Sequence, residues 1–186
     1  MNPTETFFLH GEIDVTPILS IINDNNLNWD EYTARQKKYG GEHQFTKTIP
    51  IIFDKSLNFN HTKIMLTEHY PLFETEIFNL EEKIKFSTGE SGKIMRALLV
   101  KLAPKKFIRP HIDGVGHSLV ICRRIHIPIQ TNEDCFFIVG DDRRHLRKGE
   151  LWEINNDKKM HSVENNGNED RIHLIVDWIE NKFLQS

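Results

Sequence analysis

Residues 119–129 read Leu-Val-Ile-Cys-Arg-Arg-Ile-His-Ile-Pro-Ile, and residues 171–178 read Arg-Ile-His-Leu-Ile-Val-Asp-Trp. In both stretches apolar residues recur at every second position, which is the period of a β-strand. Each strand has one apolar face and one mixed face, which carries Arg124 and His126 in the first and Arg171 and His173 in the second. If the apolar faces pack against helices or a second sheet, these four side chains line a barrel interior. Alternation alone favours the reverse, because cationic groups inside a barrel are costly unless they are paired.

Short strands with turn signals between them continue on both sides of these two stretches. The candidates are 94–102, 118–129, 135–139, 150–154, 161–163 and 172–178. Before them, the pattern predicts a strand over 46–53 and two helices. The first helix starts at Thr16-Pro17 with Thr16 as its N-cap, and the second runs from Pro71 to Gly89. Many short strands in series, preceded by helices, predict a mainly β sandwich or jelly-roll barrel with flanking helices.

The composition restricts the class of protein. A length of 186 residues predicts one domain, and a net charge of −3 argues against broad electrostatic binding to nucleic acid. Two cysteines without a CxxC pattern fit a reducing compartment. The first residues lack the basic and apolar regions of a signal peptide, and no apolar run is long enough to span a bilayer. We therefore expect a cytoplasmic protein without a membrane partner.

His111-Ile112-Asp113 is the first candidate for chemistry. Residues two apart on a strand project to the same side, so the imidazole and the carboxylate can reach one ion. The pair follows Arg109-Pro110 and precedes two glycines, which indicates a strand end meeting a loop, where functional sites concentrate. A single His-x-Asp is common by chance, and a solvated histidine beside a turn aspartate explains it equally well.

His161 is the preferred third ligand, because an arginine follows it at about the length of a hairpin. Arg171 lies ten residues downstream across an Asn-Gly turn, and a hairpin would bring its guanidinium beside the ion. A guanidinium binds a carboxylate in bidentate fashion, so Arg171 could hold the far end of a small dicarboxylate. The alternative for Arg171 is a surface ion pair with a neighbouring acidic residue. Three other histidines compete for the third position: His126, His145 and His173.

Two histidines and one carboxylate form the facial triad of non-haem Fe(II) enzymes and leave three positions open on an octahedral ion. A 2-oxo acid can fill two of these positions and dioxygen the third. Zinc sites more often use three histidines or several cysteines, although a zinc hydrolase or a cupin-type isomerase fits the triad as well.

The segment from about residue 94 to 179 resembles the aspartyl/asparaginyl β-hydroxylase family of Fe(II)/2-oxoglutarate-dependent dioxygenases. Five pieces of sequence carry the resemblance in order and spacing: 110–113 (Pro-His-Ile-Asp), 124–128 (Arg-Ile-His-Ile-Pro), 149–152 (Gly-Glu-Leu-Trp), 161–165 (His-Ser-Val-Glu-Asn) and 171–177 (Arg-Ile-His-Leu-Ile-Val-Asp). Some members of the family have glycine in place of the carboxylate, whereas this chain keeps Asp113.

The resemblance implies a double-stranded β-helix. In a single domain over 1–186, residues 94–179 would form the core that carries the site, and residues 1–93 a support of helices and a strand. It also implies iron bound by His111, Asp113 and His161, with Arg171 on the 5-carboxylate of 2-oxoglutarate. Arg124 and His126 would lie in the cosubstrate pocket.

The implied reaction uses Fe(II), 2-oxoglutarate and O2 to hydroxylate an unactivated C–H bond, with succinate and CO2 as co-products. The substrate would be an amino acid, either free or within a polypeptide. Trp29 and Tyr32 are candidates for the substrate entrance, although core or rim packing explains them equally well. Two alternatives to this reaction are a cupin-like zinc hydrolase or isomerase, and a barrel that binds a carboxylate without catalysis. The sequence leaves the oligomeric state open.

Overall fold

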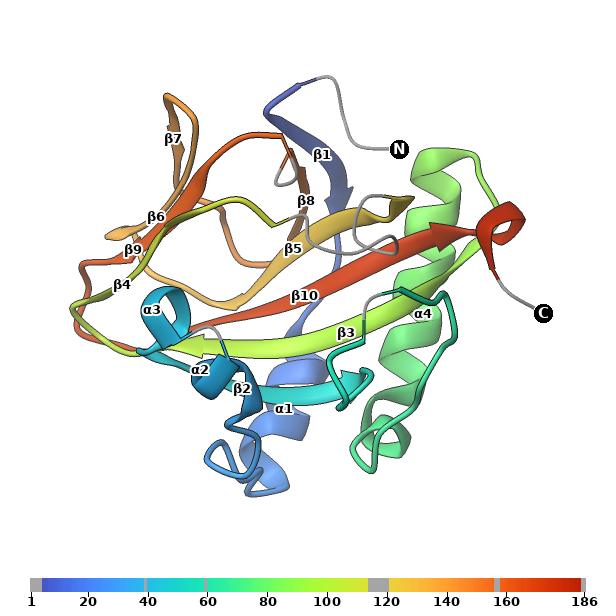
Figure 1. Cartoon of the computed structure of the whole chain (residues 1–186), viewed down its shortest axis with the longest axis horizontal. Coiled ribbons are helices and arrows are strands. Elements are labelled where there is room, and N and C mark those ends of the chain that lie inside the picture. Colours follow the sequence, from blue (N-terminus) through green and yellow to red (C-terminus); the bar gives the residue numbers. More distant parts are fainter. Residues whose placement is uncertain (1–4, 39, 59, 114–120, 156–157, 185–186) are drawn as a thin grey trace.

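A computed structural model describes residues 5–38, 40–58, 60–113, 121–155 and 158–184 (Figure 1). The larger of its two antiparallel sheets has six strands. In spatial order they are β1 (Phe7–Glu12), β8 (Glu150–Ile154), β5 (Arg123–Gln130), β10 (Arg171–Glu180), β3 (Gly92–Leu102) and β2 (Thr46–Ile52). The smaller sheet contains β4 (Lys106–His111), β9 (His161–Asn165), β6 (Cys135–Val139) and β7 (Asp142–Arg144). The expected fold class, a mainly β double-stranded β-helix with flanking helices, is confirmed.

The outer face of the large sheet packs against helices. These are α1 (Thr16–Asp24) and α4 (Tyr70–Thr88), while α2 (Ala34–Lys38), α3 (Gly40–His43) and the 3-10 turn η1 (Asn181–Phe183) are short. Alternate apolar residues of β5 and β10 form one buried cluster with the apolar stripes of both helices. Burial of each such side chain stabilises the fold by roughly 1.5–3 kcal/mol. The mixed faces of the two strands therefore point inward, toward the small sheet, which corrects the solvent-facing orientation that alternation alone favoured.

The helix ends follow the sequence signals with one difference. In α4, Pro71 lies in the first turn, and Gly89 closes the helix at φ 69°, where its N–H donates to the carbonyl of Lys85 at 2.9 Å. In α1, Thr16 is already helical, and Asp14 Oδ1 accepts the N–H of Thr16 at 2.9 Å. The N-cap expected at Thr16 is wrong by one residue, because Val15 is the N-cap and the amide of Thr16 donates to the carboxylate of Asp14.

The strand predicted over 118–129 begins at Arg123, since Ile121 and Cys122 are not extended, and residues 118–120 lie outside the described part of the chain. The strand predicted over 46–53 is β2, which forms an edge of the large sheet. Its register shifts between Pro50 and Ile52, as expected for a proline at an edge or a bulge.

The hairpin expected between His161 and Arg171 is wrong. β9 pairs with β4 and β6 in the small sheet, whereas β10 pairs with β3 and β5 in the large sheet. The chain crosses from one sheet to the other between Asn165 and Arg171. Buried Asn165 holds this crossing, because its amide N–H groups donate to the carbonyls of Leu102, Ala103 and Glu169 at 2.8–3.2 Å.

Candidate functional site

Pairing of β4 with β9 brings the three candidate ligands together. His111 ends β4 and lies opposite His161, the first residue of β9, and Asp113 follows two positions after His111. The Nε2 atoms of His111 and His161 lie 3.5 Å and 3.6 Å from the two oxygens of the Asp113 carboxylate. One ligand atom from each residue falls within 4.8 Å of the others. Within the described part of the chain, this is the one group of three histidine, cysteine or acidic side chains close enough to share an ion.

A backbone contact fixes the proton of His111. Its Nδ1 lies 2.7 Å from the carbonyl oxygen of Arg109. A carbonyl only accepts hydrogen bonds, so Nδ1 carries the proton and Nε2 presents its lone pair toward Asp113 and His161. Metal-binding histidines commonly have such a contact on the ring nitrogen away from the ion.

The protonation states suit a cation. Burial lowers the pKa of His161 to about 4, so the imidazole is neutral at neutral pH. Burial alone would raise the pKa of Asp113, but the charge of Arg124, a hydrogen bond from His111 and the nearby histidines together hold that pKa well below the usual range. Two imidazoles and one carboxylate are the donor set that Fe(II) takes in facial-triad enzymes, so the residues present fit that ion.

Arg124 lies directly beside the proposed ligands. Its Nη1 donates to Asp113, while its Nε and Nη2 donate to the two oxygens of Asp177 at 2.7 Å and 2.9 Å. Arg96 donates to Asp177 at 2.7 Å from the other side. The sequence predicted Arg124 for the cosubstrate pocket, and its position next to the Asp113 carboxylate leaves that role a prediction.

Arg171 is a buried cation without a carboxylate. Its residue is 3% exposed, and its Nη2 lies 2.9 Å from Nδ1 of His173. No ion pair to an acidic side chain joins Arg171 to any other residue that the structure describes. Burial lowers the pKa of Arg171 to about 9. An uncompensated buried guanidinium fits an anionic ligand, because such a charge is costly until it is paired.

His126 lies close to both Arg171 and the candidate metal group, since the charges of Arg171 and Asp113 both act on its imidazole. Both of its ring nitrogens are buried without a hydrogen-bond partner among the described residues. Burial, followed by the charges of Arg124 and Arg171, lowers the pKa of His126 well below its usual value. A neutral imidazole whose nitrogens lack a hydrogen-bond partner among the described residues could contact a polar ligand. The role that the sequence predicted for His126 in a cosubstrate pocket stays a prediction.

The ring of Phe137, on β6, joins these groups. It stacks on His161 with centroids 6.0 Å apart, meets His126 edge-on at 4.8 Å, and lies 5.9 Å from the guanidinium carbon of Arg171. Sequence analysis missed Phe137 and also Asp177. Asp177 had a signal, since it shares the inward face of its strand with Arg171 and His173, whereas nothing local distinguishes Phe137 from an ordinary core residue.

His43 is a further missed neighbour of the site. It ends α3 in the N-terminal part of the chain, and its ring meets the ring of His111 edge-on at 5.4 Å. Of the rivals for the third ligand, His173 bonds to Arg171, and Nδ1 of His145 lies 3.0 Å from the carbonyl of Cys135.

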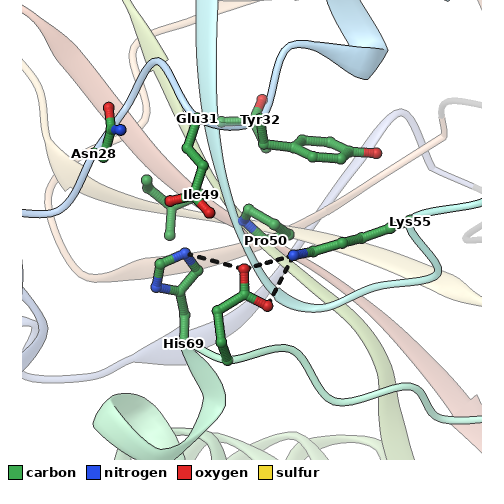
Figure 2. A pocket seen from close by; sticks show the side chains of 9 residues that line it. Asn28, Glu31, Tyr32, Ile49, Pro50, Lys55 and His69 are labelled. Carbon is green, nitrogen blue, oxygen red and sulfur yellow. Dashed lines mark hydrogen bonds and ion pairs between the residues drawn. The ribbon is translucent and has the colours of Figure 1, made fainter.

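A second hollow lies at the edge strand β2, and Figure 2 shows its lining. Within it, Lys55 donates to both oxygens of Glu68, at 2.5 and 2.8 Å, and His69 lies 3.9 Å from the same carboxylate. These charges neutralise one another, and the side chains form no group able to share a metal ion among the residues described. The site at β4 and β9 is therefore the stronger candidate for chemistry.

Comparisons with known proteins identify the family of the chain and the relatives of its fold. The sequence profile of the family described as aspartyl/asparaginyl beta-hydroxylase matches residues 78–181. No curated protein sequence matches the chain. None of the described helices has the length and apolar character needed to cross a membrane.

Three solved structures share the fold at low sequence identity. A 2OG-Fe(II) oxygenase family oxidoreductase from Burkholderia pseudomallei has a TM-score of 0.56 at 15% identity, over 72% of this chain and 66% of its own. A prolyl hydroxylase from Trichoplax adhaerens, in complex with a hypoxia inducible factor peptide fragment, has a TM-score of 0.58 at 12% identity, over 96% and 86%. A prolyl-4-hydroxylase from Pseudomonas putida has a TM-score of 0.54 at 10% identity, over 96% and 94%.

The match of the family profile covers more than half of the 186 residues and includes all three candidate ligands together with Arg124, His126 and Arg171. The chain therefore belongs to the aspartyl/asparaginyl β-hydroxylase family.

Proposed function

We propose that this protein is an Fe(II)/2-oxoglutarate-dependent dioxygenase that hydroxylates an unactivated C–H bond of an amino acid, either free or within a polypeptide. The proposal rests on two features that lie together in the interior of the barrel. A His-Asp-His group fits a divalent ion, and a buried arginine without a carboxylate partner, Arg171, lies beyond it. A dicarboxylate that chelates the ion at one end and meets the guanidinium at the other satisfies both features.

The residues have distinct tasks in this proposal. Nε2 of His111, Nε2 of His161 and one oxygen of Asp113 would hold the iron. Bound there, the iron supplies the activation of dioxygen that is coupled to oxidative decarboxylation of 2-oxoglutarate to succinate and CO2. The polypeptide supplies orientation and a water-poor interior, as expected for an enzyme whose cofactor performs the difficult chemistry.

Arg171 would bind the distal carboxylate of 2-oxoglutarate with its planar fork. Phe137 would form the apolar side of this pocket. The ring nitrogens of His126, which lack a hydrogen-bond partner among the described residues, would face it. Arg124 remains bound to Asp177 through two nitrogens and keeps the Asp113 carboxylate ionised and oriented. The ion would thus meet an Asp113 carboxylate that is already ionised.

An anaerobic titration tests the proposal. Fe(II) and 2-oxoglutarate, added together to the metal-free protein, should produce the visible metal-to-ligand charge-transfer band of the chelate. Admission of oxygen should then consume 2-oxoglutarate and form succinate. A zinc hydrolase or isomerase would give neither signal, and a barrel that only binds a carboxylate would give no succinate.

A further inference from the structure

The strand that carries His111 is paired on one side only. β4 lies at the edge of the small sheet, and β9 is its one neighbour among the described strands. The register of this pairing shifts just before His111, since Ile108 lies opposite Val163 while His111 lies opposite His161. Two residues of β4 therefore face one residue of β9 between these pairs, which is the arrangement of a β-bulge.

The bulge sets the direction of His111 but weakens the support of its backbone. A bulge re-aims the side chains that follow it and interrupts the ladder of hydrogen bonds between the strands. Pro110, inside the bulge, has no N–H to donate. The carbonyl of Arg109, which lies 2.7 Å from His111 Nδ1, belongs to the same bulge and moves with it. A contact from outside the bulge would therefore help to fix this imidazole relative to the rest of the barrel.

The N-terminal part of the chain provides such a contact. α3 packs against β4 (Figure 1), and its last residue, His43, presents its ring to His111. The ring planes lie at 77° to each other with centroids 5.4 Å apart, an edge-on arrangement that aromatic rings favour. The ring of His161 lies 4.2 Å from that of His111, measured between centroids. His111 thus contacts both a second proposed ligand and a residue from outside the segment 78–181 that matches the family profile.

His43 is itself anchored to the large sheet. The hydroxyl of Thr46 donates to the carbonyl of His43 at 2.8 Å. Thr46 is buried, begins β2 and lies opposite Leu102 of β3. The side-chain amide of Gln36, on α2, donates to the carbonyl of Thr46 at 2.7 Å. The end of α3 is therefore tied to a strand of the other sheet, and its position does not depend on the bulge in β4.

Phe45 provides a second attachment to β4. Its ring meets that of Phe107 edge-on with centroids 5.7 Å apart, and the ammonium nitrogen of Lys106 lies 4.8 Å from its centroid. Phe45 also packs against a buried apolar cluster that includes residues of β4 and β9. Segment 43–45 therefore contacts β4 near both of its ends, at Lys106 and at His111.

We infer that His43 is a positioning residue for the proposed metal centre, because it holds the imidazole of His111 in the direction that the ion requires. The inference rests on the proposed function only in needing a divalent ion at His111, Asp113 and His161. It makes the N-terminal part of the chain a contributor to metal binding. By thermodynamic linkage, an ion that binds better when His43 contacts His111 also stabilises the docked position of segment 43–45.

Co(II), added to the metal-free protein, tests this role through its absorption and without turnover. His43→Ala should weaken Co(II) binding by roughly three- to tenfold, because all three donors remain but the direction of one imidazole is no longer fixed. His43→Phe keeps an aromatic ring at the contact and should bind Co(II) within about twofold of the wild type. Gln44→Ala is the matched control, since Gln44 is the exposed neighbour of His43 and should leave the affinity unchanged.

Hydrogen exchange gives a second readout that does not depend on equal stability of the variants. Each protein is compared with itself, with and without saturating Co(II). In the wild type the ion should slow exchange of the backbone amides of segment 43–45 by at least about twofold. The slowing should persist in His43→Phe and disappear in His43→Ala. Exchange that Co(II) leaves unchanged in the wild type would overturn the coupling between this segment and the ion.

The outcomes separate the inference from the proposed function. Equal Co(II) affinity in His43→Ala and the wild type would overturn the positioning role, even if the wild type forms the charge-transfer band with Fe(II) and 2-oxoglutarate. An equal loss in His43→Ala and His43→Phe would also overturn it, because the site would then require the polar atoms of the imidazole. Co(II) binding that depends on the His43 ring, without the charge-transfer band, would support the positioning role and contradict the oxygenase. A wild type that binds no Co(II) would overturn both.

Discussion

Arg124 donates a hydrogen bond to the Asp113 carboxylate, the group that lies between the imidazoles of His111 and His161. The same guanidinium is fixed by two bonds to Asp177, which is 1% exposed. Burial alone would lower the pKa of Arg124, but the carboxylates of Asp177 and Asp113 outweigh it and keep Arg124 charged, and this positive charge helps to keep Asp113 ionised. Arg124 and Asp177, which belong to the large sheet, therefore help to keep the carboxylate of the candidate metal group ionised and in place.

Replacement of the carboxylate tests its role as a ligand. Asp113→Asn should weaken Fe(II) binding by at least roughly tenfold, because the amide removes the anionic donor while Arg124 keeps its two bonds to Asp177. Anaerobic calorimetry, or the absorption of Co(II) used as a probe, measures the affinity. Asp170→Asn is the control, since Asp170 is a half-exposed partner of Lys101 at 3.5 Å. Unchanged affinity in Asp113→Asn would remove Asp113 from the ligand set.

Replacement of His161, the second proposed histidine ligand, should have a stronger effect on activity. His161→Ala should abolish iron-dependent succinate formation, because His111 and Asp113 alone hold the ion poorly. His69→Ala is a suitable control, as His69 lies in the hollow at the edge of β2 (Figure 2). Turnover close to that of the wild type in His161→Ala would show that another residue completes the site.

Local patterns predicted much of the fold. Two-residue alternation indicated the strands, a helical stripe with Pro71 and Gly89 indicated α4, and the five family segments identified the architecture. These signals are readable because each depends on neighbours within a few positions of the chain. The structure also brings His111, Asp113 and His161 together, although their role as iron ligands stays a prediction.

Contacts between distant segments were not predictable in the same way. The chain crosses between sheets after Asn165 instead of forming a hairpin, and Asn165 holds the crossing by donating to the carbonyls of Leu102 and Ala103 at the end of β3 and of Glu169 within the crossing. The importance of Phe137 depends on three partners from β5, β9 and β10. None of these relationships leaves a periodic signal in the sequence.

Arg171 should lower the stability of the ligand-free protein and strengthen the binding of 2-oxoglutarate. Arg171→Met replaces a buried, unpaired cation with an apolar side chain of similar volume, so it should raise the free energy of unfolding of the ligand-free protein by about 1–4 kcal/mol. The same change should raise the KM for 2-oxoglutarate by roughly 100-fold or more, because a charge-assisted bidentate contact is lost. Urea unfolding and initial-rate kinetics measure the two effects.

A surface arginine serves as the control for this experiment. Arg143→Met removes a half-exposed partner of Glu164 and should change neither quantity by much. A loss of stability in Arg171→Met, with an unchanged requirement for 2-oxoglutarate, would mean that Arg171 has a structural role and no carboxylate to bind.

Buried histidines should make the metal-free protein sensitive to mild acid. Burial lowers the pKa of His161 to about 4 and holds the pKa values of His126 and His173 well below their usual range. In the unfolded chain a histidine titrates at about 6.5, so between these values the unfolded state binds more protons than the folded state. The contribution of these histidines to the free energy of unfolding is therefore fully present above pH 6.5 and is lost as the pH is lowered. His161 alone accounts for up to about 3 kcal/mol between pH 6.5 and 4.

Urea unfolding at pH 7.0, 6.0 and 5.0 measures this dependence. The slope should decrease in His161→Gln, which keeps a polar group at the position but cannot take up a proton on unfolding. Saturating Fe(II) binds the folded state and should add stability at each pH. A free energy of unfolding that stays constant from pH 7 to pH 5 in the metal-free protein would mean that these histidines are protonated equally in both states, and would contradict their burial as neutral groups around the site.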